Sequence, residues 1–86
     1  MMQLKDTVGM MLSNDYVERF KAEYYQTKIR YQRLGDLLKK QAEGQLIFEP
    51  KSSLANLNLQ FTYMGLYLLV LKARAAEEGI VLEDDD

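Results

Sequence analysis

The sequence predicts an all-α fold: an antiparallel two-helix hairpin, preceded by a short N-terminal helix or arm, that assembles into a helical oligomer. Two runs of apolar residues predict the hairpin, because each run alternates steps of three and four and so lies on one stripe of a helix. The runs are Val17, Phe20, Tyr24, Thr27, Tyr31, Leu34 and Leu38, and Leu54, Leu57, Phe61, Met64, Leu68, Leu71 and Ala75. Each stripe requires a partner helix, and the other run supplies one.

A second apolar stripe on the later helix predicts the oligomer. Its members are Leu59, Tyr63, Leu66, Val70 and Ala73. A lone two-helix hairpin has no surface left to cover them. Burying the four large side chains would stabilise association by at most roughly 6 to 12 kcal/mol per protomer, whereas surface salt bridges contribute about 0 to 1 kcal/mol each. We therefore expect a homo-oligomer whose interface contains these five residues.

The chain reads as one domain that begins with an arm over residues 1–13 and a first long helix over residues 15–43. The arm is apolar enough to dock on a neighbouring element. Asp15, followed three residues later by Glu18, resembles a capping box and marks the start of the helix. Gly44 then supplies the left-handed backbone at which helices often stop.

A loop over residues 44–52 separates the two helices, and its apolar trio Leu46–Phe48 is expected to fold back over the end of the hairpin. Ser52 or Ser53 caps the second helix, which is predicted over residues 53–78. Gly79 ends this helix, and Ile80 is placed for the apolar contact that commonly follows a glycine cap. Residues 80–86 form an acidic tail, expected to fray from Val81 onward.

Composition narrows the class of protein. Of the 86 residues, 48% are hydrophobic and 28% are charged, which is typical of a folded chain. The absence of cysteine from the sequence fits a reducing cytoplasm. The longest apolar runs, such as Leu66–Leu71, fall short of the roughly 20 residues that a membrane-spanning helix needs, and the start of the chain has no signal-peptide layout. We expect a soluble protein without a membrane partner.

Enzymatic chemistry is disfavoured by the residue types that are missing. The sequence contains no histidine and no cysteine, which removes the commonest general base, the commonest metal ligand and the strongest nucleophile. Ser13, Ser52 and Ser53 lie at helix starts, where capping explains them. No glycine-rich phosphate loop is present. The sequence predicts a protein that is not an enzyme and that uses no metal or cofactor.

Charge is distributed unevenly along a chain whose net charge is −2. Between Arg19 and Lys40 there are seven basic residues and two acids, whereas Glu77 to Asp86 holds six acids and no base. The middle of the first helix therefore attracts anions. The acidic tail disfavours nucleic acid, because a long phosphate backbone would have to avoid it.

Five residues of the first helix are candidates for ligand binding: Lys21, Tyr24, Tyr25, Lys28 and Tyr31. Their spacing of three, four and seven puts most of them on neighbouring rows of one helix face. Tyrosine rings offer flat faces for a purine, and lysine ammonium groups offer positive charge for phosphate. The alternative is that Tyr24 and Tyr31 are core residues and the lysines are solvated flanks, which spacing alone favours. However, a seam containing two tyrosines and Thr27 is more polar than a core requires, as expected of a cleft between protomers.

Two stretches carry a resemblance to a known group of proteins. YVERFKAEYYQTKIRYQRLGDLL, from Tyr16 to Leu38, and YMGLYLLVLKARAAEEGI, from Tyr63 to Ile80, resemble small phage and prophage proteins built as helical hairpins. The architecture is more loosely similar to phage hairpin proteins that assemble into hexamers and sequester nucleotide immune signals of the bacterial CBASS and Thoeris systems. This second similarity is one of shape and not of a shared motif.

The resemblance implies an anti-defence protein in the cytoplasm of an infected bacterial host. It would bind a cyclic dinucleotide, another cyclic oligonucleotide or a cyclic ADP-ribose isomer without cleaving it. The pockets would lie between protomers of a homo-oligomer, with a hexamer as one option, and the five candidate residues would line them. The identity of the ligand stays open.

Two other functions fit the sequence. A coiled-coil interaction module would bind a host or phage protein, through Met10, Met11, Leu46 and Phe48. It would need no small ligand. A nucleic-acid-binding hairpin would use the basic first helix and would retain DNA or RNA in a salt-sensitive way. This last function ranks below the others because of the acidic tail.

Overall fold

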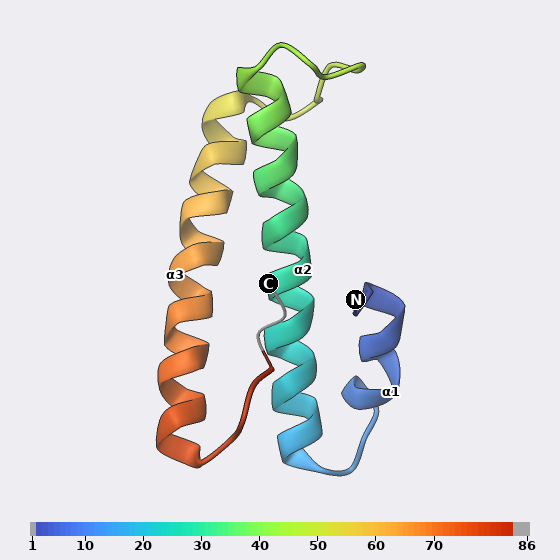
Figure 1. Cartoon of the computed structure of the whole chain (residues 1–86), viewed down its shortest axis with the longest axis vertical. Coiled ribbons are helices and arrows are strands. Elements are labelled where there is room, and N and C mark those ends of the chain that lie inside the picture. The colour runs from blue at the N-terminus through green and yellow to red at the C-terminus, as the bar shows by residue number, and fades with distance from the viewer. Residues whose placement is uncertain (1, 84–86) are drawn as a thin grey trace.

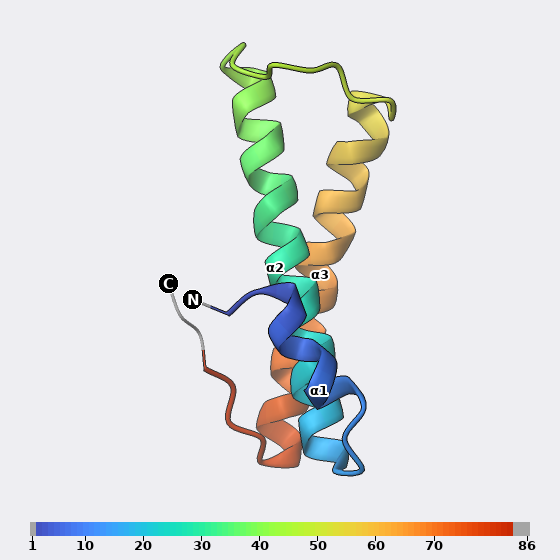
Figure 2. The same cartoon turned by 90° about the vertical axis from the view of Figure 1, so that its right-hand side faces the viewer.

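The computed structural model describes residues 2–83, and within this range the chain is all-helical with no strand. A 3-10 helix, η1 (Leu4–Thr7), leads into a short α1 (Val8–Met11), followed by the two long helices α2 (Tyr16–Ala42) and α3 (Leu54–Glu78). α2 and α3 lie side by side and run in opposite directions, with η1 and α1 against the first half of α2 (Figures 1 and 2). Met1 of the predicted arm and residues 84–86 of the predicted tail lie outside the described range.

Local side-chain signals set the ends of the two long helices. The Asp15 carboxylate accepts a hydrogen bond of 3.0 Å from the Val17 amide, and the Ser53 hydroxyl accepts one of 3.1 Å from the amide three residues on. Each bond satisfies one of the backbone donors that a helix start leaves unpaired. At the other end of α3, Gly79 takes the left-handed conformation with a φ of 71°. The predicted capping roles of these three residues are confirmed.

The core lies in the half of the α2–α3 pair that is far from the loop. It consists of Phe20, Tyr24, Tyr25, Leu68, Leu71, Ala75 and Ile80. None of the described residues from Gln26 to Tyr67 is buried. The apolar stripes predicted from the sequence continue to the loop, so the structure buries them over only part of their length. Leu54, for example, is 49% exposed.

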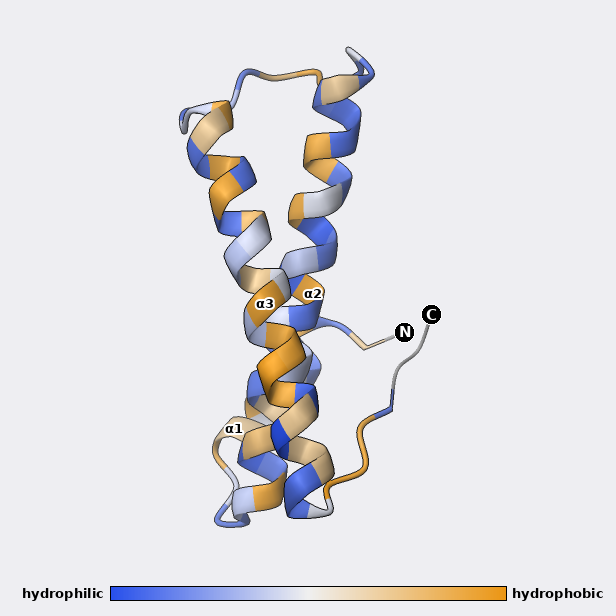
Figure 3. Cartoon of the chain, turned by 90° about the vertical axis from the view of Figure 1, so that its left-hand side faces the viewer, coloured by the Kyte–Doolittle hydropathy of each residue, from blue (hydrophilic) through white to orange (hydrophobic). Residues whose placement is uncertain are grey.

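Two aromatic rings mark the place where the helices are still close together. Tyr31 of α2 stacks on Phe61 of α3, with centroids 4.3 Å apart and ring planes 6° from parallel. Both rings face a glycine: a Cβ at Gly65 would lie 3.2 Å from the Tyr31 ring, and one at Gly35 would lie 2.9 Å from the Phe61 ring. Gly65 therefore lies at a close contact between the helices. Beyond this point the helices diverge toward the loop (Figures 2 and 3).

The apolar trio of the loop covers the end of the helix pair only in part. Leu46 and Phe48 line a hollow there, whereas Ile47 does not, so the expectation was wrong for Ile47. Ile47 is 99% exposed and Phe48 is 56% exposed, while Leu46 is partly buried. The physical reason is the divergence of α2 and α3, because separated helix ends offer no closed apolar surface on which three side chains can pack.

The N-terminal arm packs on α2. The Gln26 side-chain amide donates a hydrogen bond of 3.1 Å to the Thr7 hydroxyl, and that hydroxyl donates one of 2.7 Å to the Leu4 carbonyl. Thr7 is fully buried, and Met2 and Met10 pack against the core. These contacts hold the arm in place even though η1 and α1 are too short to be stable helices alone.

The start of the tail is ordered where the sequence led us to expect fraying. Ile80 is buried, Leu82 packs against the core, and the Glu83 amide donates a hydrogen bond of 2.8 Å to the Tyr25 hydroxyl. The segment therefore turns back along α2 after Gly79 (Figure 1). Over residues 81–83 the expectation of a frayed tail was wrong, because Leu82 packs against the core and the Glu83 amide is bonded to Tyr25.

One helix within residues 2–83 is long and apolar enough, by length and composition alone, to cross a membrane. This is α3, whose most apolar 18-residue window is only 11% buried. The prediction from unbroken apolar runs did not identify α3, because each Asn, Thr or Gly interrupts such a run. The mean hydropathy of an 18-residue window tolerates these residues. The same property is found in core helices of soluble proteins.

Candidate functional site

A groove of about 450 Å³ lies between α2 and α3, next to the core on the side toward the loop. Tyr24, Lys28, Tyr31 and Gln32 line it from α2, and Thr62, Gly65, Leu66, Leu68, Leu69 and Lys72 line it from α3. We call these residues the Lys28–Lys72 groove. Three of the five residues that the sequence proposed for ligand binding are therefore brought together in one place.

Helical spacing explains why these side chains share the groove. Tyr24, Lys28 and Tyr31 are separated by four and three residues on α2, so they lie along one face. On α3, Gly65, Leu68 and Lys72 follow the same rule. Since Gly65 has no side chain, it leaves space that a larger residue would fill, and the Tyr31 ring occupies part of that space.

The groove combines positive charge with apolar walls. Lys28 and Lys72 come from different helices, and none of the described lining residues is acidic. Leu66 and Leu69 are each more than half exposed, which gives the groove an apolar rim on α3. Ammonium groups suit phosphate oxygens, and apolar or aromatic surface suits the flat face of a base. This is the arrangement that a small anionic ligand with an aromatic ring requires.

The tyrosines proposed for ligand binding have different environments. Tyr24 is 1% exposed, so most of its ring is packed in the core. Tyr25 is 8% exposed and lies outside the groove, with its hydroxyl bonded to the tail through Glu83. Tyr31 is partly buried, with one face against Phe61. Tyr31 is therefore the tyrosine of the set with the most surface left for a ligand.

Of the two lysines proposed for ligand binding, Lys28 lines the groove and Lys21 does not. Lys72 was missed by the sequence analysis, because it lies on the other helix and the register between two helices is not written in a helical periodicity. A signal was present: residues 54–71 contain no charged side chain, and Lys72 is the first charge after this stretch.

The outer face of α3 is apolar and open to solvent. Its five predicted interface residues, Leu59, Tyr63, Leu66, Val70 and Ala73, are all exposed, with Tyr63 at 62% and Val70 at 55%. Figure 3 shows how hydrophobic residues run along this helix. Leu66 belongs both to this face and to the groove, so the two surfaces are continuous.

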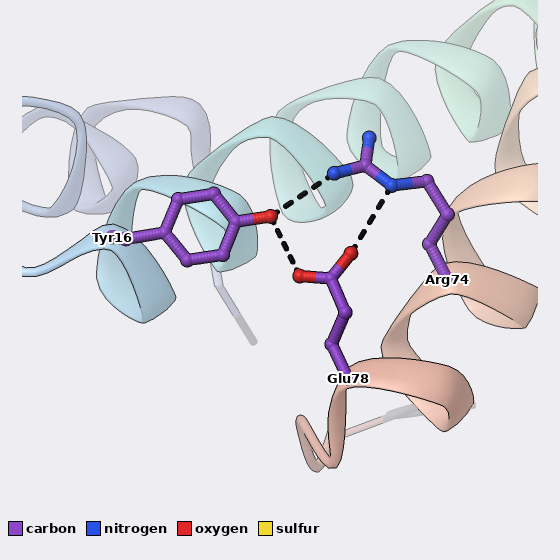
Figure 4. A network of polar contacts seen from close by, with 3 residues as sticks. All are labelled: Tyr16, Arg74 and Glu78. Atoms are coloured by element: carbon purple, nitrogen blue, oxygen red, sulfur yellow. Dashed lines mark hydrogen bonds and ion pairs between the residues drawn. The ribbon is translucent and has the colours of Figure 1, made fainter.

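A polar clasp joins the first turn of α2 to the last turn of α3 (Figure 4). The Tyr16 hydroxyl donates a hydrogen bond of 2.6 Å to Glu78 and accepts one of 3.0 Å from Arg74, which also pairs with Glu78 at 3.3 Å. Arg74 lies 5.0 Å from the centre of the Phe20 ring. The bond to the Glu78 carboxylate raises the pKa of Tyr16 above its usual value. The clasp fixes the relative position of the helices at this end.

No cluster of three His, Cys, Asp or Glu side chains that could hold a metal ion occurs in the described part of the chain. The lining of the groove likewise includes no histidine, cysteine or carboxylate among its described residues. The described lining of the groove presents two ammonium groups, tyrosine rings and leucine side chains.

Comparison with models of known protein families assigns the chain to one family. The model of the Sequestin family matches residues 14–77, which include every residue of the Lys28–Lys72 groove. The chain belongs to the Sequestin family. The family name indicates a sequestering function, that is, binding without catalysis, in keeping with the role that the resemblance implied. No curated protein and no solved structure shows significant similarity to the chain.

Proposed function

We propose that this protein sequesters a small anionic nucleotide and releases it unchanged, and that helical hairpins formed by α2 and α3 assemble to create the binding sites. The ligand class is a nucleotide immune signal, either a cyclic ADP-ribose isomer or a cyclic oligonucleotide. The protein would act as a phage-type anti-defence protein in the cytoplasm of an infected bacterial cell. Membership of the Sequestin family supports the sequestering role.

The observation that carries the proposal is the Lys28–Lys72 groove. Two lysines from different helices flank an apolar wall and a partly buried tyrosine ring. Hydrogen bonds to charged groups contribute about 1.5 to 3 kcal/mol each, and stacking contributes about 1 to 3 kcal/mol per base. Two charged contacts and one stacked base would together contribute about 4 to 9 kcal/mol. A micromolar constant corresponds to roughly 8 kcal/mol, so micromolar binding lies at the upper end of this range.

Assembly through the outer face of α3 would complete the site. Leu66 and Leu69 line the groove and are also exposed on α3. A second copy packed on this face, against Leu59, Tyr63, Leu66, Val70 and Ala73, would therefore form part of the groove wall and shield the lysines from water. Shielding strengthens attraction between charges, because the effective dielectric constant falls. A hexamer is one assembly that fits the proposal.

A protein partner suits the outer face of α3 better than a lipid bilayer does. α2 packs along α3 and carries ten charged residues between Glu18 and Lys40. It could not follow α3 into hydrocarbon without exposing those charges, which costs several kcal/mol each. Insertion of α3 alone would break the core that it forms with α2.

Titration calorimetry against a panel of cyclic dinucleotides, cyclic trinucleotides and cyclic ADP-ribose isomers tests the proposal. We expect saturable binding of at least one compound by the unmodified protein. Lys28→Ala and Lys72→Ala should each weaken it about 10- to 100-fold, the equivalent of one charged hydrogen bond. Lys21→Ala is the matched control, since this lysine lies on the same helix outside the groove. Absence of heat with every compound, or equal losses in all three variants, contradicts the proposal.

A second function is favoured by the exposed apolar residues at the two ends of the molecule. Phe48 in the loop is 56% exposed and Met11 in the arm is 44% exposed, and both belong to the set expected for a protein-interaction module together with Met10 and Leu46. Such a module would capture one host or phage protein in stoichiometric amount. Three results together support this second function over the first. The unmodified protein gives no heat with nucleotides, Lys28→Ala still captures the partner protein, and Phe48→Ser does not.

A further inference from the structure

The half of the α2–α3 pair next to the loop has apolar stripes but no core. None of the described residues from Gln26 to Tyr67 is buried. The inner stripes nevertheless continue through this half with Leu34 and Leu38 on α2 and Leu54 and Leu57 on α3. Heptad-spaced apolar residues fit between those of another helix with the same spacing. Beyond the Tyr31–Phe61 stack, toward the loop, the two helices do not bury these leucines against each other.

A hollow with both apolar and polar lining residues occupies the space between the diverging helices. It has a volume of about 560 Å³ and is lined by Leu37, Leu46, Phe48, Leu54 and Leu57, together with polar residues of the loop. We call it the loop-end hollow. The Tyr31–Phe61 stack lies on the other side of it, toward the core. The loop's most exposed side chain, Ile47 at 99%, does not enter it. Figures 2 and 3 show the two helices apart at this end from opposite sides.

A second copy of the same end has the properties that the hollow requires. It brings two helices with the same apolar spacing, and it brings Ile47 and Phe48 as exposed apolar side chains. Charge permits the contact: residues 34–61 contain three acids and three bases, so two such ends meet without net repulsion. The stretch from Arg19 to Arg33 contains five bases and one acid, and two copies of it would repel each other.

We infer that the loop-end half is a self-association surface on which two copies meet end to end about a two-fold axis. Each copy places its Ile47 side chain in the loop-end hollow of the other, and the helix ends of the two copies pack against each other. The contact is reciprocal, as in most closed dimers, because hollow and filler lie on the same end of the same chain. It is separate from the outer face of α3 and does not depend on the proposed ligand.

Photo-crosslinking between isotopically distinct copies tests this inference. Ile47 is replaced by benzoylphenylalanine in ¹⁵N-labelled protein, which is mixed with unlabelled, unmodified protein, allowed to exchange, irradiated and digested for mass spectrometry. We expect crosslinks from labelled to unlabelled chains that end on residues 34–41 or 54–57. Crosslinks confined to one chain, or ending on Leu59, Tyr63 or Val70, overturn the inference. The inference is also overturned if these crosslinks are absent and the unmodified protein floats with phosphatidylcholine vesicles. That result would assign the loop-end half to a membrane surface.

Two leucines on α3 provide a matched pair of variants. Leu57→Glu places a charge in the loop-end hollow, whereas Leu59→Glu places one on the outer face, two residues away. The crosslink yield between copies should fall at least tenfold in Leu57→Glu and persist in Leu59→Glu, and circular dichroism should show retained helix because the core lies elsewhere. An unchanged yield in Leu57→Glu contradicts the inference. Phe48→Ser is a second variant for the case in which Leu57→Glu unfolds, because Phe48 lies outside both helices. It should lower the crosslink yield by the same factor.

Nucleotide titration of the same variants separates this inference from the proposed function. Leu57 and Phe48 lie outside the Lys28–Lys72 groove. Loss of the crosslink with retained nucleotide heat supports end-to-end contact whatever the ligand. A protein that gives no heat with any nucleotide but forms the crosslink retains this inference and loses the proposed function.

Discussion

The Tyr25 hydroxyl of α2 accepts a hydrogen bond of 2.8 Å from the backbone amide of Glu83, and this bond ties the tail to the core helix. Tyr25 is 8% exposed, so the bond lies at the edge of the core. Tyr25→Phe should leave the helices intact and release the end of the tail. Because a net hydrogen bond contributes about 0.5 to 1.5 kcal/mol, exchange of the Glu83 amide, followed by NMR, should accelerate about 2- to 13-fold.

Tyr63→Phe is the control for the tail variant. This tyrosine is 62% exposed on α3 and lies far from the tail in sequence. Its hydroxyl can be removed without a change at Glu83. Equal acceleration in both variants would mean that the Tyr25 bond does not hold the tail.

The glycine opposite Phe61 should not tolerate a methyl group. A Cβ at Gly35 would lie 2.9 Å from the Phe61 ring, which is held by its stack on Tyr31. Overpacking costs about 1 to 3 kcal/mol, while replacing glycine by alanine in a helix gains about 1 kcal/mol. Gly35→Ala should therefore lower the free energy of unfolding by about 1 kcal/mol, as measured by urea denaturation.

Gly9→Ala is the matched control for this substitution. A Cβ at Gly9 in α1 would meet no atom within 4 Å, so only the gain in helix propensity applies. Gly9→Ala should be neutral or stabilising. A stabilising effect of Gly35→Ala would show that Phe61 moves aside without cost and that the ring stack does not hold the helices together.

The clasp at the other end predicts a dependence on alkaline pH. The pKa of Tyr16 is raised above its usual value, mainly because its hydroxyl donates to the Glu78 carboxylate. A group with a raised pKa stabilises the fold below its unfolded pKa, about 10 for tyrosine, and loses that contribution as the pH rises through the folded pKa. The free energy of unfolding should therefore decrease above pH 10 more steeply for the unmodified protein than for Tyr16→Phe. Parallel pH profiles of thermal unfolding for the two proteins would contradict this assignment.

The outer face of α3 should control assembly without affecting the fold. Val70 is 55% exposed and full burial of such a side chain contributes about 1.5 to 3 kcal/mol. Val70→Glu should therefore weaken association at least tenfold in sedimentation velocity. Gln60→Glu is the control, since it adds the same charge at another exposed position of α3. Equal sedimentation of both variants and the unmodified protein would exclude this face as the interface.

Much of the local structure could be predicted because the signals are local. Asp15, Ser53 and Gly79 act on the backbone within three or four residues, so their capping roles can be recognised without knowledge of the packing. The two apolar stripes also predicted two long helices, since periodicity follows from the geometry of a single helix. The exposed outer face of α3 follows from the same pattern, because a helix with two apolar stripes has more apolar surface than one partner helix can cover.

The rest depends on contacts between residues far apart in the sequence. Continuous stripes predicted contact along the whole helix pair and gave no sign that the helices diverge beyond Phe61. The burial of Tyr25 depends on a tail that returns from the far end of α3, 58 residues away. Lys72 joins Lys28 only through the register of the two helices. The candidate binding residues therefore extend from one face of α2 to a groove between α2 and α3.

The central claim is that the Lys28–Lys72 groove retains an intact anionic nucleotide, and the most direct test is to identify what the protein carries. The unmodified protein and the double variant Lys28→Ala/Lys72→Ala are purified from infected bacteria, heated, and the released small molecules are compared by mass spectrometry. The account predicts an uncleaved cyclic nucleotide or cyclic ADP-ribose isomer released by the unmodified protein and depleted at least tenfold in the double variant. Identical spectra from the two proteins would contradict it.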